Sequence, residues 1–126
     1  MAFRPFGRSA GRKRFKTLLL APMSRIPELE SLLDERPDDP FVIYALAREY
    51  EKHTGTMQAL LMYEHLVNNH PDYIATYYHY AKLLYNAGNK TEALKLLATG
   101  IERGSKLKEM HAVGEMRGLA ELWSEE

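Results

Sequence analysis

Residues 70–89, HPDYIATYYHYAKLLYNAGN, hold five tyrosines and two histidines. Phenol and imidazole groups at this density are typical of proton-transfer and metal sites. However, the chain has no cysteine, no HExxH motif, and no two of its five histidines at the i, i+4 spacing of a zinc-binding helix. The sequence therefore predicts no metal and no cofactor, with exposed or half-buried histidines at positions 53, 65, 70, 79 and 111.

Acid–base and nucleophilic chemistry find no better support. Carboxylates such as Glu49, Glu51, Glu92 and Glu102 occupy polar positions, and no partner is evident that would raise a pKa. No serine, histidine and acid combination is recognisable. The segment 89–91 lacks the glycine frame of a phosphate-binding loop. The chain is predicted to have no catalytic residue and not to be an enzyme.

Composition indicates one small folded domain. The chain has 126 residues, of which 45% are apolar and 27% charged, the proportions of a globular soluble protein. No run approaches the roughly 18 consecutive apolar residues of a membrane span. The nearest thing to a secretory signal, residues 17–21, is too short for one. We expect a cytoplasmic protein without a membrane span.

The formal charge of zero hides an uneven distribution. Residues 1–22 carry six of the 17 Lys and Arg residues and no acid, so residues 23–126 have a formal charge of −6. We expect a disordered basic leader at 1–22 and a folded domain at 23–126. Nucleic-acid binding over the domain surface is disfavoured. Organelle targeting, polyanion contact by the leader and initiation at Met23 stay open.

A shift of 34 residues superimposes like residues along most of the chain, so that Pro37 meets Pro71 and Asp38 meets Asp72. Apolar positions within each unit recur every three and four residues, which is the spacing of one helix face. Six helices are predicted near 25–36, 40–53, 57–69, 73–87, 90–103 and 106–123. Asp39 before Pro40 predicts one N-cap, and Asn89 with Glu92 predicts a capping box.

This pattern resembles the tetratricopeptide repeat, TPR, whose 34-residue unit is a pair of antiparallel helices. The resemblance covers about residues 25–105 and implies an all-α solenoid: a half repeat, two full repeats and a C-terminal capping helix. It also implies a repeat core, into which the following residues are placed: Leu29, Leu32, Leu33, Ile43, Leu46, Ala47, Tyr50, Ala59, Tyr63, Leu66, Pro71, Tyr77, Tyr80, Ala81, Leu84, Ala93 and Leu97.

The last helix departs from the pattern because polar residues or glycine occupy its usual buried positions. Two docking stripes are open: Ala112, Met116, Leu119, Ala120 and Trp123, or Leu107, Met110 and Val113. We expect this helix to act as a cap.

Equivalent positions of the two full units also share polar chemistry. Tyr44 aligns with Tyr78, and Arg48 aligns with Lys82. In similar proteins these positions line a concave surface that holds an extended peptide, so the predicted peptide-binding residues are Tyr44, Arg48, Lys52, Tyr78, Lys82, Tyr85 and Asn86. Aromatic groups beside cations suit an acidic side chain or a C-terminal carboxylate. The pattern differs from the carboxylate clamp for chaperone tails, which has lysine and asparagine where Tyr44 and Arg48 stand.

The function that follows is a non-catalytic adaptor or scaffold that binds a protein or peptide. Two alternatives remain open at the level of sequence. The first is a structural homodimer through the C-terminal helix, with Leu122 and Trp123 covered by the partner. The second is polyanion binding through the basic leader.

Overall fold

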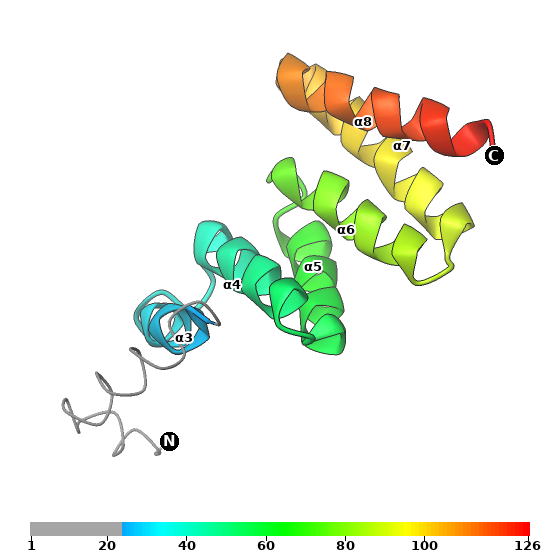
Figure 1. The fold of residues 1–126 in the computed structure, drawn as a ribbon. Coiled ribbons are helices and arrows are strands. Elements are labelled where there is room, and N and C mark those ends of the chain that lie inside the picture. Colours follow the sequence, from blue (N-terminus) through cyan, green and yellow to red (C-terminus); the bar gives the residue numbers. More distant parts are fainter. Residues whose placement is uncertain (1–23) are drawn as a thin grey trace.

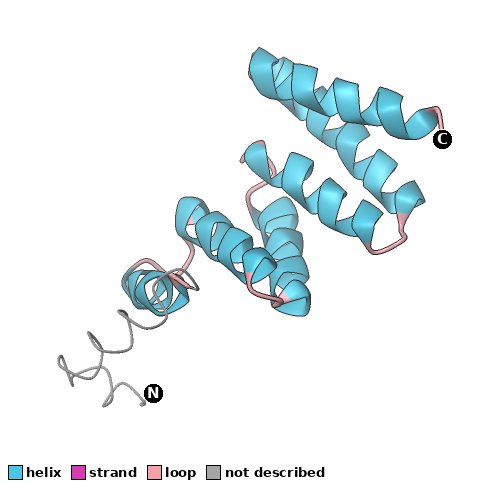
Figure 2. Cartoon of the chain, in the orientation of Figure 1, coloured by secondary structure: helices cyan, strands magenta, loops and turns pink. Residues whose placement is uncertain are grey.

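The structure is a computed structural model that describes residues 24–126. Within this range it has six α-helices and no strand, joined by short loops (Figures 1 and 2). The helices are α3 (Ile26–Glu35), α4 (Pro40–Lys52), α5 (Thr56–Asn69), α6 (Ala75–Asn86), α7 (Lys90–Lys106) and α8 (Met110–Ser124). The predicted all-α fold is confirmed. The predicted leader and its boundary at residue 22 lie outside the described residues.

The helix ends follow from local chemistry. At the start of α4, an Asp39 side-chain oxygen accepts a 2.9 Å hydrogen bond from the Phe41 N–H, and Pro40 occupies the first turn. The predicted cap is therefore present. The capping box at Asn89 is wrong, because the Asn89 side chain makes no hydrogen bond to α7. The turn before α7 instead depends on Gly88, whose φ of +89° suits a residue without a Cβ.

The helices follow one another along the molecule in chain order from α3 to α8, and each packs against the next (Figure 1). The first helices of the pairs, α4, α6 and α8, form one layer: Tyr44 of α4 contacts His79 of α6, and α6 contacts α8. The second helices, α5 and α7, pack against this layer. Residues at equivalent positions of α4 and α6 are thereby brought to the same face.

Two clusters of buried side chains form the core. The N-terminal cluster consists of Ile43, Ala47, Ala59, Tyr63 and Leu66 together with Leu83. The C-terminal cluster consists of Ile74, Tyr77, Ala81, Ala93, Leu97, Met116 and Trp123. Helix α6 contributes to both clusters, so it joins the two halves of the molecule. The small residues Ala59 and Ala93 are fully buried and allow neighbouring helices to approach closely.

The structure places all the predicted core residues at buried or half-buried positions. Those that are buried are Leu29, Ile43, Leu46, Ala47, Ala59, Tyr63, Leu66, Tyr77, Ala81, Ala93 and Leu97. Those that are half-buried are Leu32, Leu33, Tyr50, Pro71, Tyr80 and Leu84. Tyr50 keeps a polar edge, and its hydroxyl donates a 2.7 Å hydrogen bond to Glu30. Burial, and then the Glu30 carboxylate, raises the pKa of Tyr50 to about 12.

Helix α8 docks through parts of both predicted stripes. Val113, Met116 and Trp123 are buried, and Ala112, Leu119 and Ala120 are half-buried. Leu107 and Met110 are exposed. Trp123 is only 4% exposed, and its ring stacks on Tyr85 with a centroid separation of 4.1 Å. The expectation that Trp123 is available to a second chain is therefore wrong, whereas Leu122 is 56% exposed.

Candidate functional site

Four aromatic side chains meet where α4 and α6 lie side by side, and we call them the inner-face cluster: Tyr44, Tyr73, Tyr78 and His79. Ring centroids are 5.5 Å apart for Tyr44 and Tyr73, and 5.8 Å apart for Tyr44 and His79. Tyr78 and His79 meet edge to face at 5.1 Å. These separations fall in the favourable range for aromatic pairs, so each ring holds its neighbours in place.

Three members of the inner-face cluster, His79, Tyr44 and Tyr73, are uncharged at neutral pH. Burial lowers the pKa of His79 to about 4, and the positive charge of Arg48 acts in the same direction. Burial likewise raises the pKa of Tyr44 and of Tyr73, so both phenols stay protonated. The surface that the cluster presents is therefore apolar on its faces, with hydroxyl and imidazole groups that can hydrogen-bond.

Two cations flank this cluster, and they differ in how far they are already paired. Arg48 Nη1 donates a 3.0 Å hydrogen bond to Glu51 Oε1, which also accepts a 2.7 Å bond from the Tyr63 hydroxyl. Lys82 Nζ lies 5.1 Å from the Tyr78 ring centroid, a cation–π contact. Among residues 24–126, no carboxylate forms an ion pair with Lys82. Lys82 is thus the cation of the pair that is available to a ligand.

Three of the predicted binding residues lie apart from this arrangement. Lys52 Nζ pairs with Glu49 at 3.3 Å and is exposed on α4. The Tyr85 ring is engaged within the chain, stacked on Trp123, and its hydroxyl donates to the Glu126 carboxylate. Asn86 is exposed at the C-terminal end of α6. The structure brings together only Tyr44, Arg48, Tyr78 and Lys82 from the predicted set.

Sequence reasoning missed two members of the inner-face cluster, Tyr73 and His79. Tyr73 belongs to the turn before α6. The sequence predicts an exposed or half-buried position for His79 but no role in binding. The repeat register carried a usable signal, because a shift of 34 residues places His79 on Ala45, so a large aromatic side chain replaces a methyl group beside Tyr78.

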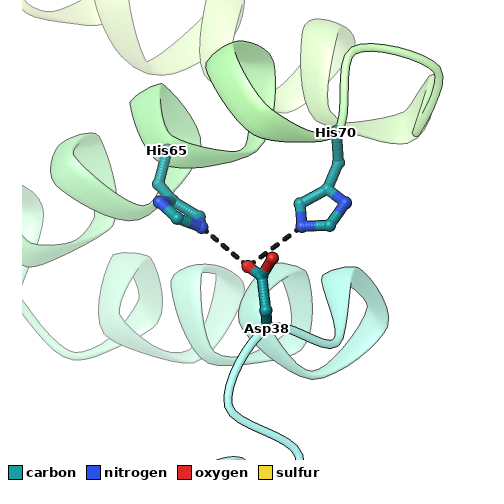
Figure 3. Close-up of side chains that lie close together, drawn as sticks. All are labelled: Asp38, His65 and His70. Atoms are coloured by element: carbon teal, nitrogen blue, oxygen red, sulfur yellow. Dashed lines mark hydrogen bonds and ion pairs between the residues drawn. The ribbon is translucent and has the colours of Figure 1, made fainter.

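A second group of side chains meets at the end of α5 (Figure 3). Asp38 Oδ1 lies 2.9 Å from His65 Nε2 and 3.0 Å from His70 Nε2. Hydrogen bonds from His65 and then His70 lower the pKa of Asp38. The three side chains each offer a ligand atom within 4.8 Å of the others, which suits a metal ion. The prediction of no metal considered only histidines four residues apart on one helix, whereas this group joins the α3–α4 turn to the C-terminal end of α5.

Stacked antiparallel helix pairs with equivalent residues on one face define the class of helical-repeat proteins, or α-solenoids. Two solved structures of a tetratricopeptide repeat domain protein from Salinibacter ruber, one by crystallography and one by NMR, match this chain with a TM-score of 0.67. They are 34% and 36% identical to it over 69% of this chain and over 97% and 88% of their own lengths, respectively. The chain therefore belongs to the tetratricopeptide repeat family.

No protein-family model matches the sequence, and the curated proteins give no match either. The structural likeness supports a protein-interaction module, since this family is in general non-catalytic and binds proteins. In the range 24–126, no helix combines the length and the apolar character needed to cross a membrane.

Proposed function

We propose that the chain is a non-catalytic adaptor or scaffold that binds a peptide or protein segment on the concave face formed by α4, α6 and α8. The observation that carries this proposal is the inner-face cluster. It joins two successive repeats through rings that remain partly exposed, next to Lys82, a cation with no carboxylate partner among residues 24–126. Partly exposed aromatic rings beside an available charge are typical of the centre of a binding surface.

The chemistry of the cluster indicates what it would bind. The ring faces of Tyr44 and Tyr78 suit an apolar or proline side chain, and Lys82 beside Tyr78 suits a carboxylate. Arg48 already forms an ion pair with Glu51, so it would contribute less to binding a carboxylate of the ligand. A segment with an apolar residue next to an acidic residue or a C-terminal carboxylate fits both requirements. The rings also hold one another in position, which lowers the entropy lost on binding.

The test is a screen of fluorescent peptides with acidic C-termini, in which binding is measured by fluorescence anisotropy. The affinity of a peptide that binds is then measured for variants of the protein. Tyr78→Ala and Lys82→Glu should each weaken binding by about tenfold or more, as expected for central contacts. Lys95→Glu makes the same charge change on α7, in the other layer, and should leave the affinity unchanged. Equal affinities for the wild type and Lys82→Glu would exclude this surface as the binding site.

Lys82→Glu is more informative than reversing Arg48 and Lys82 together. Reversal of Arg48 would also leave Glu51 without its cation, next to the buried Tyr63 hydroxyl. A loss of binding in the double variant could then come either from the lost ligand contact or from a changed fold, and the measurement would not separate the two. The double reversal is useful as a second step, once the single variants are shown to be folded by circular dichroism.

The two alternative functions have less support. Self-association through α8 could use the exposed side chains of Met110 and Leu122, but not Trp123, whose ring is covered by Tyr85. Polyanion binding by residues 1–22 concerns a segment outside the described residues. Each has a direct measurement: sedimentation at several concentrations for the first, and nucleic-acid binding at several salt concentrations for the second.

A further inference from the structure

The group of Asp38, His65 and His70 plays no part in the proposed peptide site. Asp38 lies in the turn between α3 and α4, His65 lies on α5, and His70 follows the last residue of α5 (Figure 3). Both imidazoles direct Nε2 at the same carboxylate oxygen, at 2.9 and 3.0 Å. Their ring centroids are 6.1 Å apart.

The positions of these atoms suit a transition-metal ion. Zn²⁺ binds imidazole nitrogen and carboxylate oxygen at about 2.0 to 2.2 Å, and a tetrahedral site therefore places ligand atoms about 3.4 Å apart. The ligand atoms here are separated by 2.9 and 3.0 Å on two edges and by no more than 4.8 Å on the third. Small side-chain rotations, together with transfer of each imidazole proton from Nε2 to Nδ1, would convert the hydrogen-bonded arrangement into a coordinated one.

A neighbouring side chain already orients one of the imidazoles. The Asn69 amide nitrogen lies 3.2 Å from His65 Nδ1 and 3.0 Å from the His65 carbonyl oxygen. A metal at Nε2 requires the proton of a neutral imidazole to be on Nδ1. Rotation of the Asn69 amide by half a turn would offer its oxygen to that proton, at the cost of the hydrogen bond that the amide N–H donates to the His65 carbonyl. Asn69 can thus act as the outer partner that fixes the orientation of a metal-binding histidine.

The equivalent turn of the second repeat is held by a simpler contact than the turn at Asp38. Asp72 stands 34 residues after Asp38, at the equivalent turn, and pairs with one cation, Arg103 of α7. A single positive group is therefore enough to join the acidic turn to the second helix of its unit. The first unit instead places two imidazoles on the same carboxylate oxygen, which is a donor set that transition metals prefer.

The surroundings allow an ion to enter. The side chains of Asp38 and His65 are 62% and 45% exposed, so water can fill the remaining coordination positions. The carbonyl groups at the C-terminal end of α5 add a negative potential that favours a cation. We propose that Asp38, His65 and His70 bind a divalent transition-metal ion such as Zn²⁺, with at least one coordination position open to water or to an oxygen of a partner. The ion would fasten the α3–α4 turn to the end of α5.

The test uses the untagged full chain and Zn²⁺ titrated in a calorimeter, with Co²⁺ absorption in the visible range as a second readout of coordination. We expect one ion per chain. Loss of an outer partner lowers metal affinity by about 10- to 100-fold, so loss of a ligand should lower it at least tenfold. His65→Gln, His70→Gln and Asp38→Asn should each show this loss and lose the Co²⁺ spectrum.

Two comparisons keep the result unambiguous. His111→Gln removes a histidine from α8 that is 92% exposed and lies 3.5 Å from a single carboxylate, Glu115, and it should bind like the wild type. Asp38→Asn keeps an oxygen that can accept an imidazole N–H, so it should remain folded while the rise in melting temperature with Zn²⁺ disappears. No binding by the wild type, or equal binding by the wild type and His65→Gln, would show that the group is only a hydrogen-bonded clamp.

Discussion

His79 lies between the rings of Tyr44 and Tyr78, with the positive groups of Arg48 and Lys82 nearby. An acidic group also faces it from each side, Glu51 on α4 and Glu115 on α8, but their effect is smaller than that of burial. His79 therefore stays neutral at pH 6.5, the pH at which an ordinary histidine is half protonated. A neutral ring can pack against the neighbouring tyrosines without a counter-ion.

This difference has a consequence for stability that depends on pH. The pKa of His79 is about 4 in the folded chain and 6.5 for an ordinary histidine, so the unfolded chain binds the proton more tightly. The contribution of His79 to the free energy of unfolding is therefore fully present above about pH 6.5 and is lost as the pH falls towards 4. His79→Gln should reduce the difference between urea midpoints measured at pH 7.5 and pH 4.5.

The control for this measurement is His111→Gln, which changes an exposed histidine on the last helix. It should keep the wild-type difference between the two midpoints. If His79→Gln and the wild type lose the same stability on acidification, burial of His79 does not control its charge.

At the scale of one helix, α7 depends on glycine for its close packing. A Cβ at Gly100 would lie 2.6 Å from the Tyr77 Cβ and 2.7 Å from the Met116 sulfur, both too short for real contacts. The equivalent positions in the preceding units hold Leu32 and Leu66. Gly100 therefore lets α7 approach α6 and α8 more closely than a helix with a leucine at that position could.

Gly100→Ala and Gly114→Ala should change stability in opposite directions. Alanine is favoured over glycine within a helix by about 1 kcal/mol. At Gly114 of α8 a Cβ would meet no atom of the described residues within 4 Å beyond its chain neighbours and its own helix backbone, so this gain should appear in full. At Gly100 the clash should outweigh it, with a net loss of about 1 to 3 kcal/mol. Urea denaturation followed by circular dichroism measures both, and a stabilised Gly100→Ala would contradict the packing described here.

The sequence predicted the number and order of the helices because apolar spacing of three and four residues directly reports a buried helix face. It did not predict that α7 continues to Lys106 and that α8 begins only at Met110. Small Gly104 lets the extra turn pack close to Val113. The chain then reverses at Lys108, with a φ of +63°. These contacts join residues on different helices, which a pattern within one helix cannot report.

Only those parts of the candidate site that occupy equivalent positions in the two repeats could be predicted from the sequence. Alignment of Tyr44 with Tyr78 and of Arg48 with Lys82 placed two rings and two cations on one face. The register could not show that Glu51 neutralises Arg48, since the Glu51 position is fixed by the Tyr63 hydroxyl from another helix. For the same reason it could not bring together Asp38, His65 and His70, because their meeting depends on how the α3–α4 turn lies against the C-terminal end of α5.

At the scale of the whole molecule, the two core clusters meet at α6. Leu83 belongs to the N-terminal cluster, while Tyr77 and Ala81 of the same helix belong to the C-terminal cluster. In a repeat protein, stability is approximately a sum of unit stabilities and contacts between neighbours. Loss of a contact at the junction should therefore weaken the N-terminal half and its coupling to the C-terminal half.

Leu83→Ala should separate the unfolding of the two halves. Leucine-to-alanine changes at buried sites cost about 2 to 5 kcal/mol. The chain has a single tryptophan, Trp123, which lies in the C-terminal cluster and reports on that half by fluorescence. In the variant, the circular dichroism transition should precede the fluorescence transition, while exposed Leu122→Ala should leave both together. Coincident transitions in Leu83→Ala would mean that the array unfolds as one unit.

The acidic turn at Asp38 recurs at Asp72, and each aspartate pairs with residues less than 34 positions further along the chain. Asp38 pairs with His65 and His70, and Asp72 pairs with Arg103. The segment 38–71 therefore contains both the acid and the histidines of this contact. A second copy of the segment inserted before Asp72 would include the whole contact, so the repeat array could be lengthened without a newly designed contact between units.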